Sequence, residues 1–169
     1  MSKRTSLKIL TLLIVAAVGI YLYLDTRRVN VINVHYDKYS AEVLVDHLPI
    51  TATSAINWWL TNQNAIREKY HIPSGEAGGP TNFTVFAFGT GYREEDENDM
   101  LCFDDMKPPK NCIDKEILLT VGRNRDGSTR FAFGSSAYIR FADGRLIELK
   151  KKKTPDGSWL LTHPGPMTL

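Results

Sequence analysis

The chain has 169 residues and a net charge of +2, from 21 lysines and arginines against 19 aspartates and glutamates. This near balance, without a basic run interleaved with stacking aromatic residues, argues against nucleic acid as a partner. The part that follows residue 28 is long enough for one domain with a hydrophobic core and too short for two ordinary domains.

The first segment of the chain has the layout of a membrane anchor. An uncharged run, Ile9 to Leu24, is flanked by the basic residues Lys3, Arg4, Lys8, Arg27 and Arg28. The run is slightly shorter than the roughly 20 residues that cross a bilayer core. The aliphatic stems of the flanking basic side chains extend it. We therefore predict a transmembrane helix at about residues 6–24, within an anchor over residues 1–28.

Two other interpretations of this segment remain open. It is a cleaved signal peptide if Val15 and Ala17, or Ala17 and Gly19, occupy the small-residue positions of a cleavage site. The third interpretation is a buried helix of a soluble protein.

The excess of positive charge before the apolar run predicts a cytoplasmic amino terminus. The rest of the chain is then periplasmic, in a single-pass protein of the bacterial inner membrane.

The following segments predict a hairpin and a helix. Residues 29–35 alternate valine and isoleucine with polar residues, and residues 41–45 form a second short strand. Pro49 ends this hairpin. Thr51, Thr53 or Ser54 is expected to cap a helix that runs through Tyr70. The apolar residues at helical spacing within it are Ile56, Trp59, Leu60 and Ile66.

The remaining segments predict strands around an acidic loop. Residues 83–88 form an aromatic-rich strand, and the seven carboxylates of residues 93–105 predict a solvated loop. Four more strands are expected at residues 116–121, 129–133, 137–141 and 145–149. Asp126-Gly127 and Asp143-Gly144 favour tight hairpin turns between them. The predicted fold is α+β: an N-terminal transmembrane helix, then a mostly antiparallel sheet with one main helix over residues 29–153. Residues 154–169 are expected to be a loop or tail.

Cys102 and Cys112 are the only two cysteines. In an oxidising compartment so close a pair predicts a disulfide, which stabilises by roughly 2 to 3 kcal/mol in the chain-entropy model. Two free thiols in a cytoplasmic domain are the alternative. A metal site is disfavoured, because zinc needs further ligands nearby and the four histidines are scattered singly.

The acidic loop is the candidate partner-binding site. Its carboxylates are Glu94, Glu95, Asp96, Glu97, Asp99, Asp104 and Asp105. A protein-facing patch and a merely solubilising loop both remain open. Calcium binding is disfavoured, because the glycine and the terminal glutamate of the twelve-residue calcium loop are missing. Catalysis by adjacent Asp104 and Asp105 is also disfavoured, because neighbours on an extended chain point to opposite faces.

The remaining candidates have structural explanations. Trp58 and Trp59 project about 100° apart on a helix, so at most one of them faces a site while the other packs. His35, at a strand end, and His71, after a helix, are expected to be surface or capping residues. We therefore expect no catalytic residue, no metal and no cofactor.

Four strings carry a resemblance: Trp58-Trp-Leu60, Glu68-Lys-Tyr-His-Ile-Pro73, Leu101-Cys-Phe-Asp-Asp-Met106 and Lys110-Asn-Cys-Ile-Asp-Lys115. Together with the single hydrophobic amino-terminal segment, they resemble the enterobacterial putative membrane proteins of unknown function. The resemblance covers roughly residues 5–150, and the cysteine-containing strings are its most specific part. It implies a small inner-membrane-associated protein and adds no activity, because the family has no assigned reaction or catalytic residues.

These observations lead to an expected function. We expect a non-enzymatic, membrane-tethered periplasmic module that binds another protein, in one version an immunity protein against a periplasm-acting toxin. The alternatives are an envelope assembly or stress component that acts through its anchor, and a cell-envelope enzyme.

Overall fold

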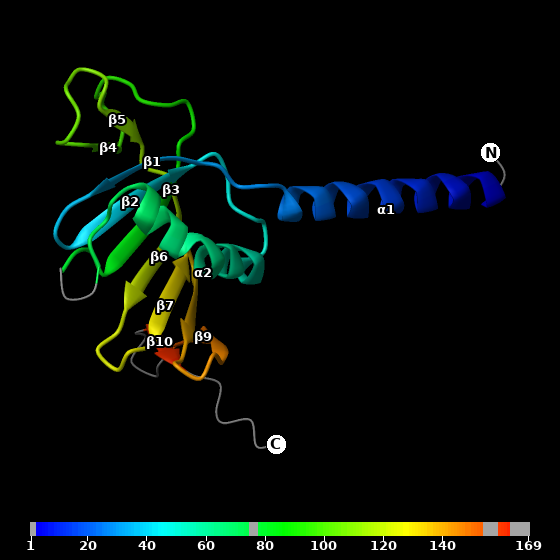
Figure 1. Ribbon diagram of the computed structural model, residues 1–169. Helices are drawn as coiled ribbons and strands as arrows, with labels where there is room; N and C mark the ends of the chain where they lie inside the picture. The colour runs from blue at the N-terminus through cyan, green and yellow to red at the C-terminus, as the bar shows by residue number, and fades with distance from the viewer. Residues whose placement is uncertain (1–2, 75–77, 154–158, 163–169) are drawn as a thin grey trace.

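The computed structural model describes residues 3–74, 78–153 and 159–162. Helix α1 (Lys3–Thr26) projects from a domain in which helix α2 (Ala52–Lys69) packs on a β-sheet (Figure 1). The strands are β1 (Val31–Tyr36), β2 (Ser40–Val45), β3 (Asn82–Ala87), β4 (Met100–Cys102), β5 (Cys112–Asp114), β6 (Ile117–Arg123), β7 (Thr129–Phe133), β8 (Ser136–Arg140), β9 (Leu146–Lys153) and β10 (Trp159–Thr162). The predicted α+β class is confirmed.

Within the described residues, eight strands form one sheet in the order β1-β2-β3-β6-β7-β8-β9-β10, and β4 pairs with β5 alone. β2 and β3 run parallel, because α2 carries the chain from the end of β2 back to the start of β3. Every other strand pair is antiparallel. The sheet is therefore mostly antiparallel, as predicted, and the parallel pair β2–β3 was not predicted.

The two predicted Asp-Gly turns are present. Gly127, between β6 and β7, and Gly144, between β8 and β9, have φ angles of 82° and 90°, which glycine adopts without a steric penalty. In each turn the aspartate carboxylate accepts a hydrogen bond from the backbone N–H two residues later, from Ser128 at 2.9 Å and from Arg145 at 3.0 Å. These turns fix the register of the strand pairs beside them.

The first core lies between α2 and the sheet. Alternation along β2 places Val43 and Val45 on this face, and α2 contributes Ile56, Trp59 and Ile66, all of them buried. The Trp59 ring centroid lies 5.0 Å from that of Phe83 on β3. Full burial of an aliphatic or aromatic side chain stabilises by about 1.5–3 kcal/mol, so this interface holds α2 against the sheet.

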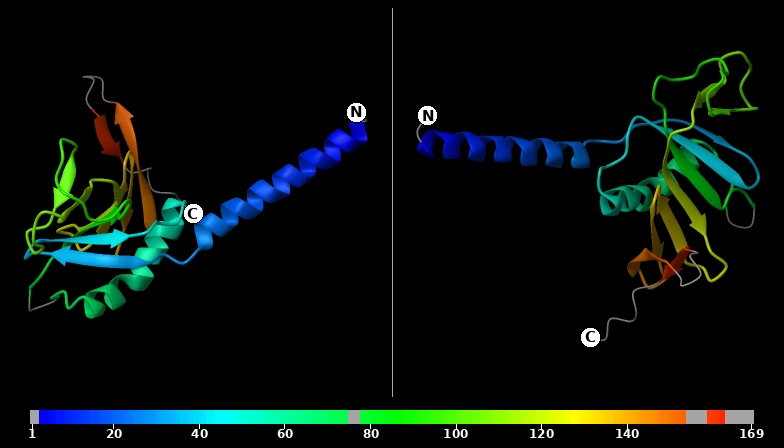
Figure 2. Two further views of the ribbon diagram at one scale, coloured as in Figure 1. Left: turned by 90° about the horizontal axis from the view of Figure 1, so that it is seen from above. Right: turned by 180° about the vertical axis from the view of Figure 1, so that it is seen from behind.

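A second core lies on the opposite face of the same strands. Leu44 of β2 and Phe86 of β3 pack there against Phe103 and Ile113. Phe103 and Ile113 belong to residues 88–114, which contain β4 and β5 and which we call the disulfide segment. The central strands are thus covered by α2 on one face and by the disulfide segment on the other. In two orthogonal views the disulfide segment lies at the side of the domain away from α1 (Figures 1 and 2).

The end of the chain differs from the expectation. β9 continues past the predicted end at residue 149 through Lys153, and β10 pairs with it, Trp159 opposite Lys153. The expectation of loop or tail was wrong at residues 159–162, because a free strand edge offers backbone donors and acceptors that a following segment can satisfy. The other tail residues, 154–158 and 163–169, lie outside the described residues.

Candidate functional site

α1 is the candidate membrane span. Residues Leu7–Thr26, 20 in number, are long and apolar enough to cross a bilayer, and none of the tested window is buried against the rest of the chain. A helix of this composition exposed to water carries a large hydrophobic cost. The third interpretation of the segment, a buried helix of a soluble protein, is therefore disfavoured within the described chain. A signal sequence has the same length and composition.

The last turn of α1 is joined to the first turn of α2. Asp25 accepts hydrogen bonds from the backbone N–H of Thr51 at 2.8 Å and from the hydroxyl of Ser54 at 2.7 Å. Thr51 is the N-cap of α2, and its hydroxyl accepts from the backbone N–H of Ser54. Asp25 therefore satisfies donors at a helix start, where a carboxylate is favoured by the helix dipole.

The disulfide segment is closed by the predicted bridge. Cys102 and Cys112 are disulfide-bonded in the structure, opposite each other on β4 and β5. Arg93 forms ion pairs with Asp114 and, at 3.3 Å, with Asp96. The backbone of Arg93 also exchanges two hydrogen bonds with that of Cys112. The bridge and these contacts hold the base of the acidic loop.

All seven predicted partner-binding carboxylates are exposed in the structure. Asp105 differs from the other six, because it also contacts a buried histidine. Asp96 accepts from the backbone N–H of Asn98, which lowers the pKa of its carboxyl group, and Asp99 pairs with Lys115 at 3.2 Å. The expectation of a solvated loop through residue 105 was wrong at its end, because Met100–Cys102 form β4 and Phe103 is buried.

Asp105 belongs to a polar network beneath the loop. Its two carboxylate oxygens both lie 2.8 Å from Nδ1 of His35, on β1. Nε2 of His35 lies 2.7 Å from the hydroxyl of Tyr92, which accepts at 2.9 Å from the side-chain amide of Asn33. The His35 ring stacks on Phe103 with centroids 3.7 Å apart. His35 is only 4% exposed, so the expectation of a surface or capping histidine was wrong.

The side-chain amide of Asn33 donates to the Tyr92 hydroxyl. In the tautomer with the imidazole proton on Nδ1, Nδ1–H donates to Asp105 and Tyr92 donates to Nε2. Burial raises the pKa of the Tyr92 hydroxyl, so the phenol keeps the proton that it donates. The order carboxylate, imidazole, hydroxyl is the order that activates a nucleophile in some enzymes. Neither cavity described below is lined by these residues. The contacts of His35 with Asp105 and Tyr92 join β1 to the disulfide segment.

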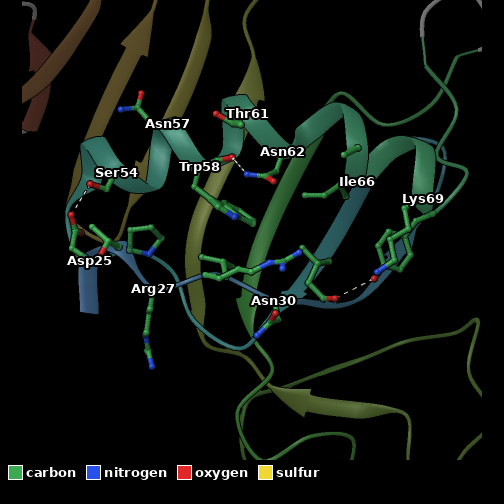
Figure 3. Close-up of a pocket in the computed structure, with 17 residues that line it drawn as sticks. Asp25, Arg27, Asn30, Ser54, Asn57, Trp58, Thr61, Asn62, Ile66 and Lys69 are labelled. Carbon is green, nitrogen blue, oxygen red and sulfur yellow. Dashed lines mark hydrogen bonds between the residues drawn. The ribbon is translucent and has the colours of Figure 1, made fainter. Parts of the chain in front are cut away.

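A cavity of about 630 Å³ lies where α1 meets the domain (Figure 3). We call it the membrane-proximal cavity. Its charged lining residues are Asp25, Arg27, Arg28 and Lys69, and its polar and apolar lining includes Asn30, Asn57, Trp58, Thr61, Asn62, Ala65, Ile66 and Tyr70. Figure 3 shows Trp58 and Asn62 projecting from α2 toward the linker between α1 and β1. Trp58 lines this cavity. Trp59 is buried in the core and also lines the second cavity described below.

A second cavity, of about 550 Å³, lies between the carboxyl-terminal half of α2 and the sheet. Arg67 stands over the Phe83 ring there at 4.5 Å, and burial lowers the pKa of its guanidinium. Among the described residues, no group of three or more histidine, cysteine, aspartate or glutamate side chains is placed to hold a metal ion.

The family comparison covers most of the chain. Residues 2–150 match the family described as "Enterobacterial putative membrane protein (DUF943)". No curated protein and no solved structure matches the chain. The match includes α1, both cysteines and the strands up to the start of the Lys150–Lys153 run.

Proposed function

From the premise that the chain belongs to this enterobacterial family of membrane proteins, we propose that it is a single-pass inner-membrane protein whose periplasmic domain binds a protein partner. One observation supports this proposal. The same chain contains an apolar helix that is not buried against the rest of the described chain and a domain with a disulfide bond. Disulfides persist in oxidising compartments, and the charges that precede the helix favour retention of the amino terminus in the cytoplasm.

The topology is tested by two fusions at the carboxyl terminus of the full chain. Alkaline phosphatase is active only after export, and green fluorescent protein delivered by the same route remains dark. We expect an active phosphatase fusion and a dark fluorescent one. The opposite pair of results would place the domain in the cytoplasm and remove the basis for the periplasmic assignment.

The acidic loop is the surface that we assign to the partner. Glu94, Glu95 and Glu97 are exposed and have no ion pair within the described residues. They lie on a segment that the disulfide holds in place, so less order is lost when a partner binds. Complementary charge steers a basic partner and raises its association rate, and the anchor confines the domain near the bilayer, which raises its effective concentration for envelope partners.

A periplasm-acting toxin with a basic active site is the concrete partner that we propose, with this protein as its immunity protein. The test compares Glu94→Lys/Glu95→Lys with the matched reversal Glu68→Lys/Glu116→Lys on other exposed positions. Cells that carry each variant are challenged with the proposed toxin, for which the products of neighbouring genes are the first candidates to test. We expect the loop variant alone to lose protection and salt-dependent toxin binding. Equal protection by both variants would eliminate the loop, and failure of the unaltered protein to protect would eliminate the immunity role.

A second candidate function is an envelope component that acts through its anchor. The hydrogen bonds from Thr51 and Ser54 to Asp25 favour it, because they join the candidate span directly to α2. Replacing residues 1–24 by a cleavable signal peptide separates the two candidates. A partner-binding module keeps partial activity as a soluble periplasmic protein, whereas an anchor-dependent component loses it.

A further inference from the structure

We propose that the membrane-proximal cavity binds the phosphate group of an anionic phospholipid of the bilayer in which α1 is inserted. The first argument is its position. The candidate span ends at Thr26, and the cavity lining begins at Asp25 and continues through the linker residues that follow. A lipid headgroup beside α1 therefore reaches the cavity without leaving the membrane surface.

The second argument is charge. Arg27, Arg28 and Lys69 line the cavity, and Asp25 is its one acidic lining residue. The Asp25 carboxylate accepts hydrogen bonds from Thr51 and Ser54 and forms no ion pair with these cations. Three cations against one carboxylate leave the lining with an excess of positive charge. Neither arginine has an ion-pair partner among the described residues. A phosphate group supplies the negative charge that these cations lack, and guanidinium binds it with two parallel hydrogen bonds.

The third argument is the chemistry of the walls. Asn57 and Thr61 are exposed lining residues whose side chains make no hydrogen bond within the described structure, and an amide and a hydroxyl suit the polar parts of a headgroup. Trp58 and Ile66 supply an apolar wall. An indole has an apolar body and one polar N–H, which suits the boundary between lipid and water. The volume, about 630 Å³, lies in the range of small-molecule sites.

The fourth argument is the distribution of charge over the domain. The cationic cavity lies at the end of α1, whereas the acidic loop lies on the side of the domain away from α1 (Figures 1 and 2). An anionic bilayer attracts the first and repels the second. The lipid contact and the protein-binding surface are therefore on different parts of the molecule, and the lipid proposal does not depend on the identity of a protein partner.

The test measures lipid binding to the full-length chain in detergent micelles by native mass spectrometry. Phosphatidylglycerol and phosphatidylcholine with the same acyl chains are titrated separately. We expect saturable binding with preference for phosphatidylglycerol, and a loss of about fivefold in affinity for each cation removed in Arg28→Gln/Lys69→Gln. The matched control, Lys110→Gln/Arg125→Gln, makes the same change of charge at exposed positions outside the cavity and is expected to retain binding.

A second pair of variants separates the cavity from general surface charge. Thr61→Trp fills the cavity from the exposed side of α2 and leaves every charge in place, and Thr53→Trp adds the same bulk on α2 outside the cavity. We expect only Thr61→Trp to lose the phosphatidylglycerol preference. If its thermal unfolding midpoint falls, Ala65→Leu is the milder filling variant at another exposed lining position.

Three results would overturn the proposal. Equal binding of the two lipids removes the preference for an anionic headgroup. Undiminished preference in both filling variants, or equal losses in the cation variant and its control, assigns the effect to surface charge and not to the cavity. Displacement of the lipid by glycerol 3-phosphate or inorganic phosphate at the same concentration as the lipid itself identifies a soluble phosphate ligand in place of the membrane.

Discussion

Asp105 and His35 are 70 residues apart in sequence, yet the carboxylate of one lies 2.8 Å from the imidazole Nδ1 of the other. This contact joins the disulfide segment to the edge strand β1 through a histidine that is almost fully buried. The hydroxyl of Tyr92 lies within hydrogen-bond distance of the second ring nitrogen, Nε2, and accepts a hydrogen bond from Asn33. The acidic loop therefore rests on a base held by a disulfide on one side and a polar network on the other.

The network predicts a ranked loss of stability. His35→Ala removes a stacked, buried ring and leaves Tyr92 without its acceptor, so we expect a loss of about 2–4 kcal/mol. Tyr92→Phe removes the hydroxyl that links the Asn33 side-chain amide to Nε2 of His35, at a cost of about 1–2 kcal/mol. Asp105 has a side chain that is 60% exposed, so Asp105→Asn is expected to cost under about 1 kcal/mol. Denaturant unfolding of the full chain in detergent measures these values. Asp104→Asn is the control, because the neighbouring Asp104 side chain makes no hydrogen bond or ion pair with the described residues. A loss as large as that of Asp105→Asn would contradict the assigned contact.

The turn between β6 and β7 predicts acid sensitivity. Hydrogen bonds from the Ser128 side chain and backbone lower the pKa of Asp126 below the ordinary value of an aspartate, 3.8. A carboxyl group with a depressed pKa in the folded state stabilises above its unfolded pKa, and this contribution disappears as the pH falls through the folded value. Asp126→Asn keeps the acceptor oxygen but does not titrate. We expect the unfolding midpoint of this variant to fall less than that of the wild type as the pH drops below about 4; identical pH profiles would show that the turn carboxylate makes no linked contribution.

Glu42 predicts the opposite pH dependence. Burial raises the pKa of this β2 carboxyl above the ordinary value of a glutamate, 4.5, while the Ser40 hydroxyl donates to it at 2.9 Å. Because the raised value favours the protonated form in the folded state, folded stability falls as the pH rises above 4.5. Glu42→Gln keeps an acceptor for Ser40 and removes the charge. We expect Glu42→Gln to be more stable than the wild type at neutral pH and as stable as the wild type below pH 4.5, the ordinary pKa of a glutamate. Thermal unfolding at a series of pH values measures this difference. A constant difference at all pH values would indicate a packing effect in place of a titration.

Loss of the disulfide is expected to destabilise the disulfide segment before the rest of the domain. Cys102 and Cys112 close a loop with a sequence separation of 10 residues, and β4 and β5 contribute no strand to the main sheet. We expect Cys102→Ser/Cys112→Ser to lower the free energy of unfolding by roughly 2 to 3 kcal/mol. Hydrogen exchange should increase first at Phe103 and Ile113, which cover Leu44 and Phe86. The backbone of α2, on the other face of the sheet, provides the internal control, and equal deprotection of α2 would mean that the two layers unfold as one unit.

Local patterns in the sequence were sufficient for most elements. The spacing of Ile56, Trp59 and Ile66 predicted α2 and its buried face, and Asp126-Gly127 predicted a turn whose glycine has a positive φ angle. These features depend on residues that are close in the chain, and the local sequence is therefore sufficient to predict them. The Cys102–Cys112 bridge was predictable for the same reason, because the two residues are close in sequence.

Contacts between distant segments were not predictable from one sequence. His35 looked like a strand-end surface residue, because nothing near it indicated that Phe103 and Asp105 would cover it. The alternation of β1 placed it on one face of the sheet, but only the fold shows that this face is buried by the disulfide segment. The parallel pairing of β2 with β3 and the joining of Asp25 to α2 are long-range features of the same kind. The membrane-proximal cavity is assembled from α1, the linker and α2, so no local motif marks it.

The sharing of Asp25 between two helices has a mechanical consequence. A chain that leaves the bilayer through a slack linker lets its domain swing over a wide arc, but here the final turn of α1 is tied to the beginning of α2. We therefore expect the domain to take a narrower range of orientations relative to α1 than a free linker would allow.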